Sequence, residues 1–449
     1  MNRIILIGNG FDLALAHNLK TRYKDFIDWF WEQTITEFGK TENYKNGKFE
    51  NDILSINLVL PIHSQLLQEV HSYNDFITYL EKEKEQDKDK RQMSISYKNL
   101  FFELITKKAN LLKNWVDIER EYYTGLKKCL NVQELRESLN IKEPNIESIK
   151  WLRNQELHGS SDINNLNIEF AQVRELLEKY LTKVYVNADL SYNDSISRQI
   201  YAPIKIGETS IAGEKHLIEF IRGNMRRQGD DSHLTGLLDR IEEDDRLEES
   251  RARANSYIIY NGRYYANPQN TIFLNFNYTG TAKRLYEVSI NGYNRYRAGT
   301  KVEFINIHGE LNNPANPIIF GYGDEMDEDY KRIENLPGSD FLKNMKSIQY
   351  SKTGNYRRIL NFVEADKYQI YVMGHSCGNS DRTLLSTLFG HDNCVSVKVF
   401  YHVYKDEEGN DKNDYTDVYC NISRNFENKP KQRAVVLPSE LSEPLAGAE

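Results

Sequence analysis

The chain opens with a short apolar run that ends in two glycines. Residues 4–7 are all aliphatic, and the run breaks at Gly8-Asn9-Gly10. Such a run is typical of a strand buried on both faces of a parallel sheet, and glycines let the backbone turn sharply and approach a ligand closely. Apolar residues then recur with helical spacing across residues 21–32. The order of strand, glycine turn and helix predicts the start of a nucleotide-binding α/β domain, although Leu13 stands where the dinucleotide fingerprint has a third glycine.

The pattern changes between about residues 40 and 255. Long amphipathic stretches alternate there with polar breaks, and the clearest stretches are residues 100–118 and 170–181. Their apolar residues recur every three or four positions, which is the spacing of a helix with one buried face. We therefore expect residues 40–255 to form a helical insertion lobe.

Strand character returns in the second half of the chain. Short, nearly unbroken apolar runs occupy residues 257–260, 271–276, 304–307, 318–320, 368–373 and 395–403. Helical patterns lie between some of them, as expected of a parallel sheet with covering helices. The predicted fold class is α/β: a Rossmann-like, mostly parallel sheet made by residues 1–39 and 256–438, with the insertion lobe over its carboxyl edge. The polar residues 439–449 are expected to be a flexible tail.

Polar clusters follow four of the predicted strands, where open α/β sheets bind their ligands. They are Gly8-Asn9-Gly10-Phe11-Asp12, residues 275–279 with Asn277, residues 308–310 with His308, and residues 374–381 with Gly374, His375, Ser376, Asn379 and Asp381. Each cluster alone could be a cap or a hydrogen-bonded turn. Their convergence at strand ends favours a nucleotide or nucleotide-like pocket.

The segment Gly374 to Gly378 also matches G-x-S-x-G, the nucleophile elbow of serine hydrolases. A triad of that type needs an acid and then a histidine downstream of the serine. The forced choice is Ser376, Asp392 and His402, which lie close together in the sequence, with His402 in or closing a strand. A serine hydrolase therefore remains a minor alternative.

Composition limits the partners of this protein. The net charge of -8 would repel nucleic acid unless a local basic patch exists, and residues 222–227 are the compact candidate, for which a solvated loop is the simpler interpretation. The four cysteines are scattered without a CxxC pair, so we expect neither a disulfide framework nor a metal site. No apolar run approaches the roughly 18 to 20 residues of a membrane span, which predicts a cytoplasmic protein without membrane contact.

Five sets of motifs occur in order along the chain, at residues 8–26, 114–123, 276–281, 307–310 with 318–321, and 371–381. They resemble motifs of the bacterial AbiH family, named for abortive phage infection. The resemblance keeps the motif order over nearly the whole chain. It implies a role in antiviral defence, alone, as a homo-oligomer or with a partner of a defence system, without fixing a reaction.

A more distant resemblance addresses the chemistry. The order of Gly-x-Gly, an asparagine after a strand and then His-Gly resembles sirtuin-like NAD-binding domains, including defence enzymes that destroy NAD. The resemblance implies that Gly8 and Gly10 lie against the diphosphate, that Asn277 orients groups near the nicotinamide ribose, and that His308 is the catalytic base. It places Ser376, Asn379 and Asp381 near the adenosine half.

Two positions depart from the sirtuin-like pattern. Asp12 stands where the pattern has serine, and Thr279 replaces the acidic residue of T-x-N-x-D. A carboxylate beside a diphosphate is repulsive, so Asp12 could instead bind ribose hydroxyls or a cation. The loss of the acid at Thr279 removes a stabiliser of a cationic transition state.

Three more side chains have two interpretations each. Asp117 and Glu119 could belong to the acidic first turn of a helix capped by Asn114, or one carboxylate could reach from the lobe over the pocket. For His17, a turn hydrogen bond is favoured over catalysis.

The leading prediction is a defence protein that binds and hydrolyses NAD or a related nucleotide, with His308 and Asn277 as the catalytic pair and no tightly bound cofactor. The alternative from another class is a non-catalytic nucleotide sensor that signals through its helical lobe to a partner. A nuclease is disfavoured by the net charge and by the lack of a clear metal–carboxylate motif.

Overall fold

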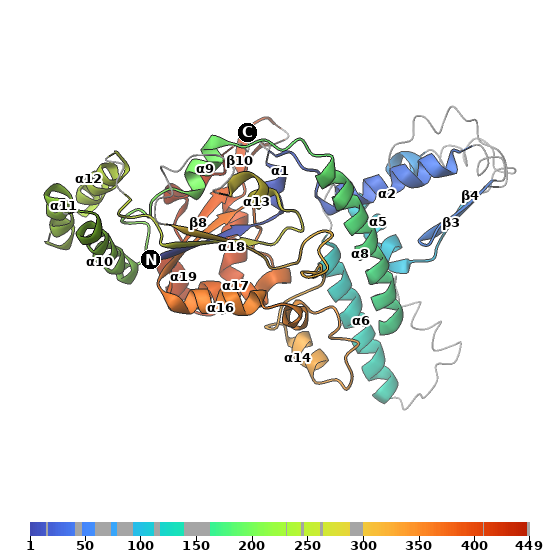
Figure 1. The fold of residues 1–449 in the computed structure, drawn as a ribbon. Helices are drawn as coiled ribbons and strands as arrows, with labels where there is room; N and C mark the ends of the chain where they lie inside the picture. The colour runs from blue at the N-terminus through green and yellow to red at the C-terminus, as the bar shows by residue number, and fades with distance from the viewer. Residues whose placement is uncertain are drawn as a thin grey trace.

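The core of the protein is a six-stranded parallel sheet (Figure 1). The computed structural model describes residues 1–14, 17–40, 47–58, 73–78, 93–111, 117–138, 162–229, 231–243, 247–260, 264–287, 300–406 and 408–446. The strands are β1 (Asn2–Ile7), β5 (Asn270–Asn275), β6 (Lys301–Asn306), β7 (Tyr368–Met373), β8 (Cys394–Tyr401) and β11 (Glu443–Pro444). Their spatial order is β11-β8-β7-β1-β5-β6. Counted along the chain this is 6-5-4-1-2-3, the Rossmann order, and it confirms the predicted α/β class with a parallel sheet.

Helices cover both faces of this sheet, so the strands are buried on two sides. Ile4 and Leu6 of β1 pack on one side and Ile5 and Ile7 on the other. The first side is covered by α16 (Asn355–Ala365), α17 (Arg382–Gly390), α18 (Tyr415–Arg424) and α19 (Lys429–Val435). The second is covered by α1 (Asn9–Leu13), α9 (Asp194–Ile200) and α13 (Thr281–Tyr286). This double burial explains why the strands read as apolar runs without alternation.

The insertion between β1 and β5 forms two bodies at opposite ends of the strands (Figure 1). One, which we call the carboxyl-edge lobe, contains α2 (Tyr23–Phe38), α5 (Leu100–Leu111), α6 (Ile118–Ser138) and α8 (Ile163–Val186). The other contains α10 (Ile211–Gln228), α11 (Ser232–Glu243) and α12 (Leu247–Tyr260), and it packs on Met1 and Val395 beside the amino ends of the strands. Only the first body can therefore reach a ligand at the carboxyl edge.

Small elements complete the described chain. The insertion also holds an antiparallel sheet of β2 (Lys48–Glu50), β3 (Leu54–Leu58) and β4 (Met93–Tyr97), so it is not purely helical. The others are α14 (Glu328–Glu334), α15 (Lys346–Gln349), η3 (Tyr350–Lys352), η4 (Asn379–Asp381), η5 (Ser439–Leu441) and the hairpin of β9 (Val403–Lys405) and β10 (Asp411–Asn413). Across the described residues, no helix has the length and apolar character needed to cross a membrane.

Two predicted strands are wrong. Residues 257–260 end helix α12, where Ile258 is buried while Ile259 and Tyr260 point to solvent. Residues 318–320 are buried but lie in no strand. In both places the packing of neighbouring elements overrides the β propensity of a short apolar run.

The chain after residue 438 differs from the expected flexible tail. Residues 439–446 form η5 and the edge strand β11, which pairs with the end of β8. The Leu445 amide donates to the Tyr401 carbonyl at 2.8 Å, and the Leu445 side chain is buried. The pairing with β8, the buried Leu445 and the ion pairs of Glu443 with Lys205 and Lys398 together hold this polar segment.

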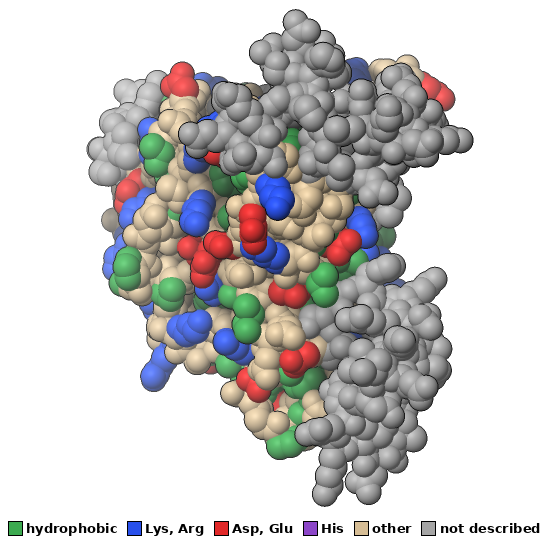
Figure 2. All heavy atoms as spheres, turned by 90° about the vertical axis from the view of Figure 1, so that its right-hand side faces the viewer, with side chains coloured by type: hydrophobic (Ala, Val, Ile, Leu, Met, Phe, Trp, Pro, Cys, Tyr) green, Lys and Arg blue, Asp and Glu red, His purple; other side chains and the backbone are tan. Residues whose placement is uncertain are grey.

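Charges are mixed on the described surface of the carboxyl-edge lobe. Figure 2 shows Lys and Arg side chains interspersed with Asp and Glu on that face, without an extended basic surface among the described side chains. The basic segment 222–227 belongs to the last turns of α10 rather than to a loop, and Arg222 pairs there with Asp239 and Glu242. This pairing neutralises Arg222, whereas Arg226 and Arg227 stay exposed at the end of the helix.

Candidate functional site

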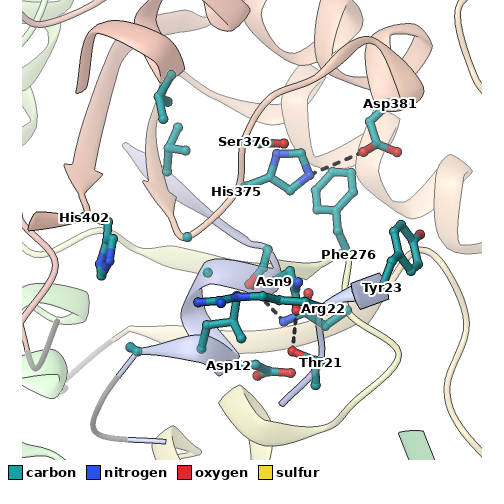
Figure 3. A pocket seen from close by; sticks show the side chains of 18 of the residues that line it. Asn9, Asp12, Thr21, Arg22, Tyr23, Phe276, His375, Ser376, Asp381 and His402 are labelled. Atoms are coloured by element: carbon teal, nitrogen blue, oxygen red, sulfur yellow. Dashed lines mark hydrogen bonds and ion pairs between the residues drawn. The ribbon is translucent and has the colours of Figure 1, made fainter. Parts of the chain in front are cut away.

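A pocket of about 640 Å³ opens at the carboxyl edge of the sheet, around the ends of β1 and β7 (Figure 3). The strand order reverses between these two strands, which is where Rossmann-type sheets bind ligands. Most of the predicted site residues line it: Gly8, Asn9, Gly10, Asp12, Asn277, His308, Gly374, His375, Ser376 and Asp381. Two others are not among the lining residues. Phe11 is fully buried in the core against Tyr286, and Asn379 begins η4.

The glycines at this pocket hold two loops against each other. Gly374 has a φ of +73°, and a Cβ atom there would lie 2.0 Å from the Phe11 nitrogen. A Cβ at Gly8 would lie 2.4 Å from the Cα of His375, and the Gly10 amide donates to the Gly374 carbonyl at 2.8 Å. The close approach of the loops after β1 and β7 is thus sufficient reason for glycine at these positions.

Asn277 joins the loop after β5 to the loop after β1. Its side-chain amide donates to the Gly8 carbonyl at 2.9 Å, and its own backbone N–H donates to Asn275 Oδ1 at 3.1 Å. The residue is almost completely buried. Its position in the pocket agrees with the sequence, and the hydrogen bonds identify it as a group that fixes the pocket's shape.

Asp12 is a carboxylate buried beneath the pocket. Its side chain is 1% exposed, and Oδ2 accepts a hydrogen bond from the Thr279 hydroxyl. Oδ1 has no hydrogen-bond partner among the described residues. Burial raises the pKa of Asp12 to about 6, although Thr279, Thr281 and Asn277 favour the ionised form.

Asp381 is the centre of a buried polar cluster. One oxygen lies 2.8 Å from Lys346 Nζ and 3.1 Å from His308 Nε2, and the other lies 3.5 Å from His375 Nε2 (Figure 3). Burial alone would raise the pKa of Asp381, but Lys346 and the histidines hold it well below its ordinary range. Asp381 is therefore ionised at neutral pH.

His308 lies in the pocket wall with both ring nitrogens near protein groups. Nδ1 is 3.1 Å from the Phe276 carbonyl and Nε2 is 3.1 Å from Asp381 Oδ1, and both partners can only accept, so they compete for the one proton of the neutral ring. Nε2 also lies 3.4 Å from the Tyr350 hydroxyl. Burial and Lys346 lower the pKa of His308 to about 4, against the opposing effect of Asp381. The ring is thus neutral at pH 7.

His375 is held in the tautomer that carries its proton on Nε2. The Cys377 backbone N–H donates to Nδ1 at 2.9 Å, so Nε2 of the neutral ring carries the proton and faces Asp381. The ring also packs on Phe276, with centroids 4.2 Å apart. His375 therefore helps to fix Asp381 and the aromatic wall of the pocket.

The carboxyl-edge lobe reaches into this cluster through Glu119. Glu119 accepts from Lys346 Nζ at 2.9 Å and from the Gly321 amide at 3.1 Å. Burial raises the pKa of Glu119, and Lys346 offsets only part of that effect. Asp117, which also lines the pocket, caps α6 by accepting from the Arg120 amide at 3.0 Å. Asp117 is thus the residue that caps the helix, and Glu119 is the carboxylate that reaches from the lobe into the site. The proposed cap Asn114 lies outside the described residues.

His17 and Lys346 are the last two side chains to compare with the sequence-based expectations. His17 makes the favoured turn hydrogen bond, with Nδ1 2.6 Å from the Phe11 carbonyl and Nε2 3.0 Å from the Tyr286 hydroxyl. Lys346 is fully buried and was missed by the sequence analysis. It stands in a segment of mixed polar and apolar residues, and no local pattern distinguishes it from a surface lysine.

The serine hydrolase triad is not assembled. Asp392 precedes β8 and is fully exposed, whereas His402 follows β8, and an eight-residue strand spans roughly 26 Å. The positive φ of this turn belongs to Cys377 rather than to Ser376. Asp392 therefore cannot act as the acid of a triad with Ser376 and His402.

The charged lining of the pocket is predominantly acidic. Asp12, Asp117, Glu119 and Asp381 face it together with Asp414 and Asp417, against Arg22 and Lys24. Lys24 pairs with Asp28, whereas Arg22 makes no ion pair with any described residue and extends beside Asn9 (Figure 3). Arg22 is therefore the side chain best placed to meet an anionic group of a ligand. The described residues contain no group of three or more His, Cys, Asp or Glu side chains that could hold a metal ion.

The family of the chain follows from a comparison with family models. Residues 4–403 match the model described as bacteriophage abortive infection AbiH. The chain belongs to this family. The match spans most of β1, the insertion and the chain to β8, with the pocket loops after β1, β5, β6 and β7, and it confirms the resemblance found in the sequence. AbiH membership implies a role in phage abortive infection defence. Neither the curated proteins nor the solved structures contain a significant match.

Proposed function

We propose that this AbiH protein acts in phage defence by binding NAD or a related nucleotide in the pocket and hydrolysing its N-glycosidic bond. The observation that carries the proposal is the convergence of the loops after β1, β5, β6 and β7 on one pocket at the switch point of a Rossmann-ordered sheet. This geometry is what a nucleotide site on such a sheet requires.

Hydrolysis of the N-glycosidic bond needs a base that activates water and negatively charged groups that stabilise the cationic ribosyl centre. Water adds to the anomeric carbon, nicotinamide leaves as a neutral molecule with the electrons of the glycosidic bond, and Nε2 of His308 takes the proton of the water. The tautomer with its proton on Nδ1, facing the Phe276 carbonyl, has the lone pair for this role on Nε2, and the resulting imidazolium would donate to Asp381 at 3.1 Å. The acidic lining would stabilise the cationic ribosyl centre while the bond breaks.

The two departures from the sirtuin-like pattern support the same assignment because they contact each other. Asp12 stands at the position of the pattern's serine and Thr279 at that of its acid, and the two side chains are hydrogen-bonded. The carboxylate and the hydroxyl have exchanged loops. A carboxylate therefore still lies between the ends of β1 and β5.

Nicotinamide release from NAD by the purified full-length protein tests the proposal. We expect release by the wild type and at least about a 100-fold slower rate for His308→Gln, which removes the base. His233→Gln is the matched control, because His233 is exposed on α11, at the far end of the strands. Absence of release from the wild type, or equal rates for His308→Gln and wild type, would contradict hydrolysis.

One observation favours the alternative of a nucleotide sensor. Glu119 of α6 and Leu177 and Leu181 of α8 line the pocket, so the carboxyl-edge lobe contacts whatever binds there. A sensor predicts that NAD raises the melting temperature of the protein without any release of nicotinamide.

A further inference from the structure

The carboxylate of Asp12 has an unmet hydrogen-bonding capacity in the pocket. Oδ2 accepts from Thr279, but Oδ1 is buried without a partner among the described residues, and Asp12 lines the pocket. A buried acceptor that has lost water and gained no donor destabilises the folded protein. Such an oxygen can be satisfied by a ligand that brings a donor.

The surroundings of Asp12 select the kind of donor. The polar neighbours that favour its ionised form are the neutral Thr279, Thr281 and Asn277 rather than a lysine or arginine. Among the described residues only Thr279 meets hydrogen-bond geometry with the carboxylate, and the Asn277 amide donates to Gly8. Phosphate groups are therefore repelled from this corner of the pocket, whereas neutral hydroxyl groups are attracted. The Oδ1 atom has lone pairs for two hydroxyl donors.

The location of Asp12 points to a particular pair of hydroxyls. Its hydrogen bond to Thr279 places the carboxylate between the loops after β1 and β5, the first and second strands of the Rossmann order. Dinucleotide-binding sheets commonly place there an acidic residue that binds ribose hydroxyls, although they supply it from the second strand. In this chain the first loop supplies the carboxylate to the same region.

We propose that Asp12 binds the free 2′,3′-diol of a ribose and so restricts the pocket to ribonucleotides with an unmodified diol. The inference rests on the proposed function, since it names the part of the nucleotide that Asp12 contacts. A deoxyribose would leave Oδ1 unpaired, and a 2′-phosphate would put its charge against the carboxylate.

Calorimetric titration of the full-length protein tests this assignment. His308→Gln serves as the background so that NAD is not consumed. The probes are NAD and two analogues that lack the 2′-hydroxyl of either the adenosine ribose or the nicotinamide ribose. We expect one analogue to bind about 10- to 100-fold more weakly than NAD, as for the loss of a buried hydrogen bond to a charged group.

Substitution of Asp12 should remove this discrimination. Added to the background, Asp12→Asn should weaken NAD binding by a similar factor and bind NAD and the sensitive analogue equally. Asp392→Asn is the matched control, because Asp392 is a fully exposed carboxylate that does not line the pocket, and it should leave both affinities unchanged.

The outcomes separate this inference from the proposed function. If both analogues bind as well as NAD, or if Asp12→Asn keeps the discrimination, the role of Asp12 is wrong while nucleotide binding stands. If NAD and both analogues fail to bind, the proposed function fails and the inference with it. The analogue comparison with Asp12 intact decides the question even if the substituted chain does not fold.

Discussion

Replacing Asp12 by asparagine should stabilise the ligand-free protein at neutral pH. The carboxyl has a pKa of about 6 in the folded chain, against its ordinary value of 3.8. The difference of about 2.2, at about 1.4 kcal/mol for each tenfold change in proton affinity, corresponds to about 3 kcal/mol. Asparagine is neutral at every pH and has nearly the same shape, so it avoids the burial of this charge.

The sign of the effect follows from proton linkage. Between pH 3.8 and 6 the folded chain keeps a proton on Asp12 that the unfolded chain has lost, so the free energy of unfolding falls as the pH rises. The deficit is absent well below pH 3.8 and complete above about pH 6. Asp12→Asn should therefore exceed the wild type by about 1 kcal/mol at pH 4.5 and by about 3 kcal/mol at pH 7.5.

Urea denaturation of the ligand-free proteins, followed by tryptophan fluorescence at these two pH values, measures the effect. Asp417→Asn makes the same chemical change at an exposed position and should match the wild type at both. A gain from Asp12→Asn that is the same at pH 4.5 and pH 7.5, or a loss at both, would refute the reasoning. A residue that destabilises the free protein in this way is more easily explained by binding than by folding.

Three further substitutions test the architecture of the site, each by its change in the free energy of unfolding. Gly374→Ala should destabilise the protein by more than about 3 kcal/mol, because its Cβ would meet the Phe11 backbone at positive φ, whereas Gly390→Ala meets open space and should be nearly neutral. Lys346→Met should remove about 3 to 5 kcal/mol, since it leaves buried carboxylates without their cation; an unchanged stability would mean that the lysine is not buried. Leu445→Ala should remove about 2 to 4 kcal/mol, and a neutral result would return this segment to a flexible tail.

The sheet and the loops at its carboxyl edge can be predicted from the sequence. Parallel strands buried on both faces leave unbroken apolar runs, and β1, β5, β7 and β8 were all recognised by them. Polar residues directly after these runs must gather at one edge of the sheet, whatever the details of the fold. His308 and Asn277 could therefore be placed at one pocket without knowing the strand order.

The parts that could not be predicted depend on contacts between distant segments. Lys346 becomes a buried cation only because Asp381 and Glu119 arrive from elements far away in the chain. The division of the insertion into two bodies likewise depends on which apolar helix faces meet, and amphipathic periodicity does not identify a partner. For the strands β3 and β4, a period-2 alternation is visible in Leu54–Leu58 and Met93–Tyr97, but five residues are too short to outweigh a helical background.

The contact between Lys346, Asp381 and Glu119 also offers a physical route by which ligand binding in the pocket could affect the position of α6 in the insertion. Lys346 is the cation for both carboxylates, one from the loop after β7 and one from α6 of the carboxyl-edge lobe. A ligand that draws Asp381 or His308 toward itself weakens one half of this arrangement and so changes how firmly α6 is held. Coupling of this kind needs no contact between the ligand and the lobe, because a buried charge without its partner destabilises its surroundings by several kcal/mol. The proposed hydrolysis and the alternative of sensing would therefore be compatible at one site, because the same charged cluster would serve both.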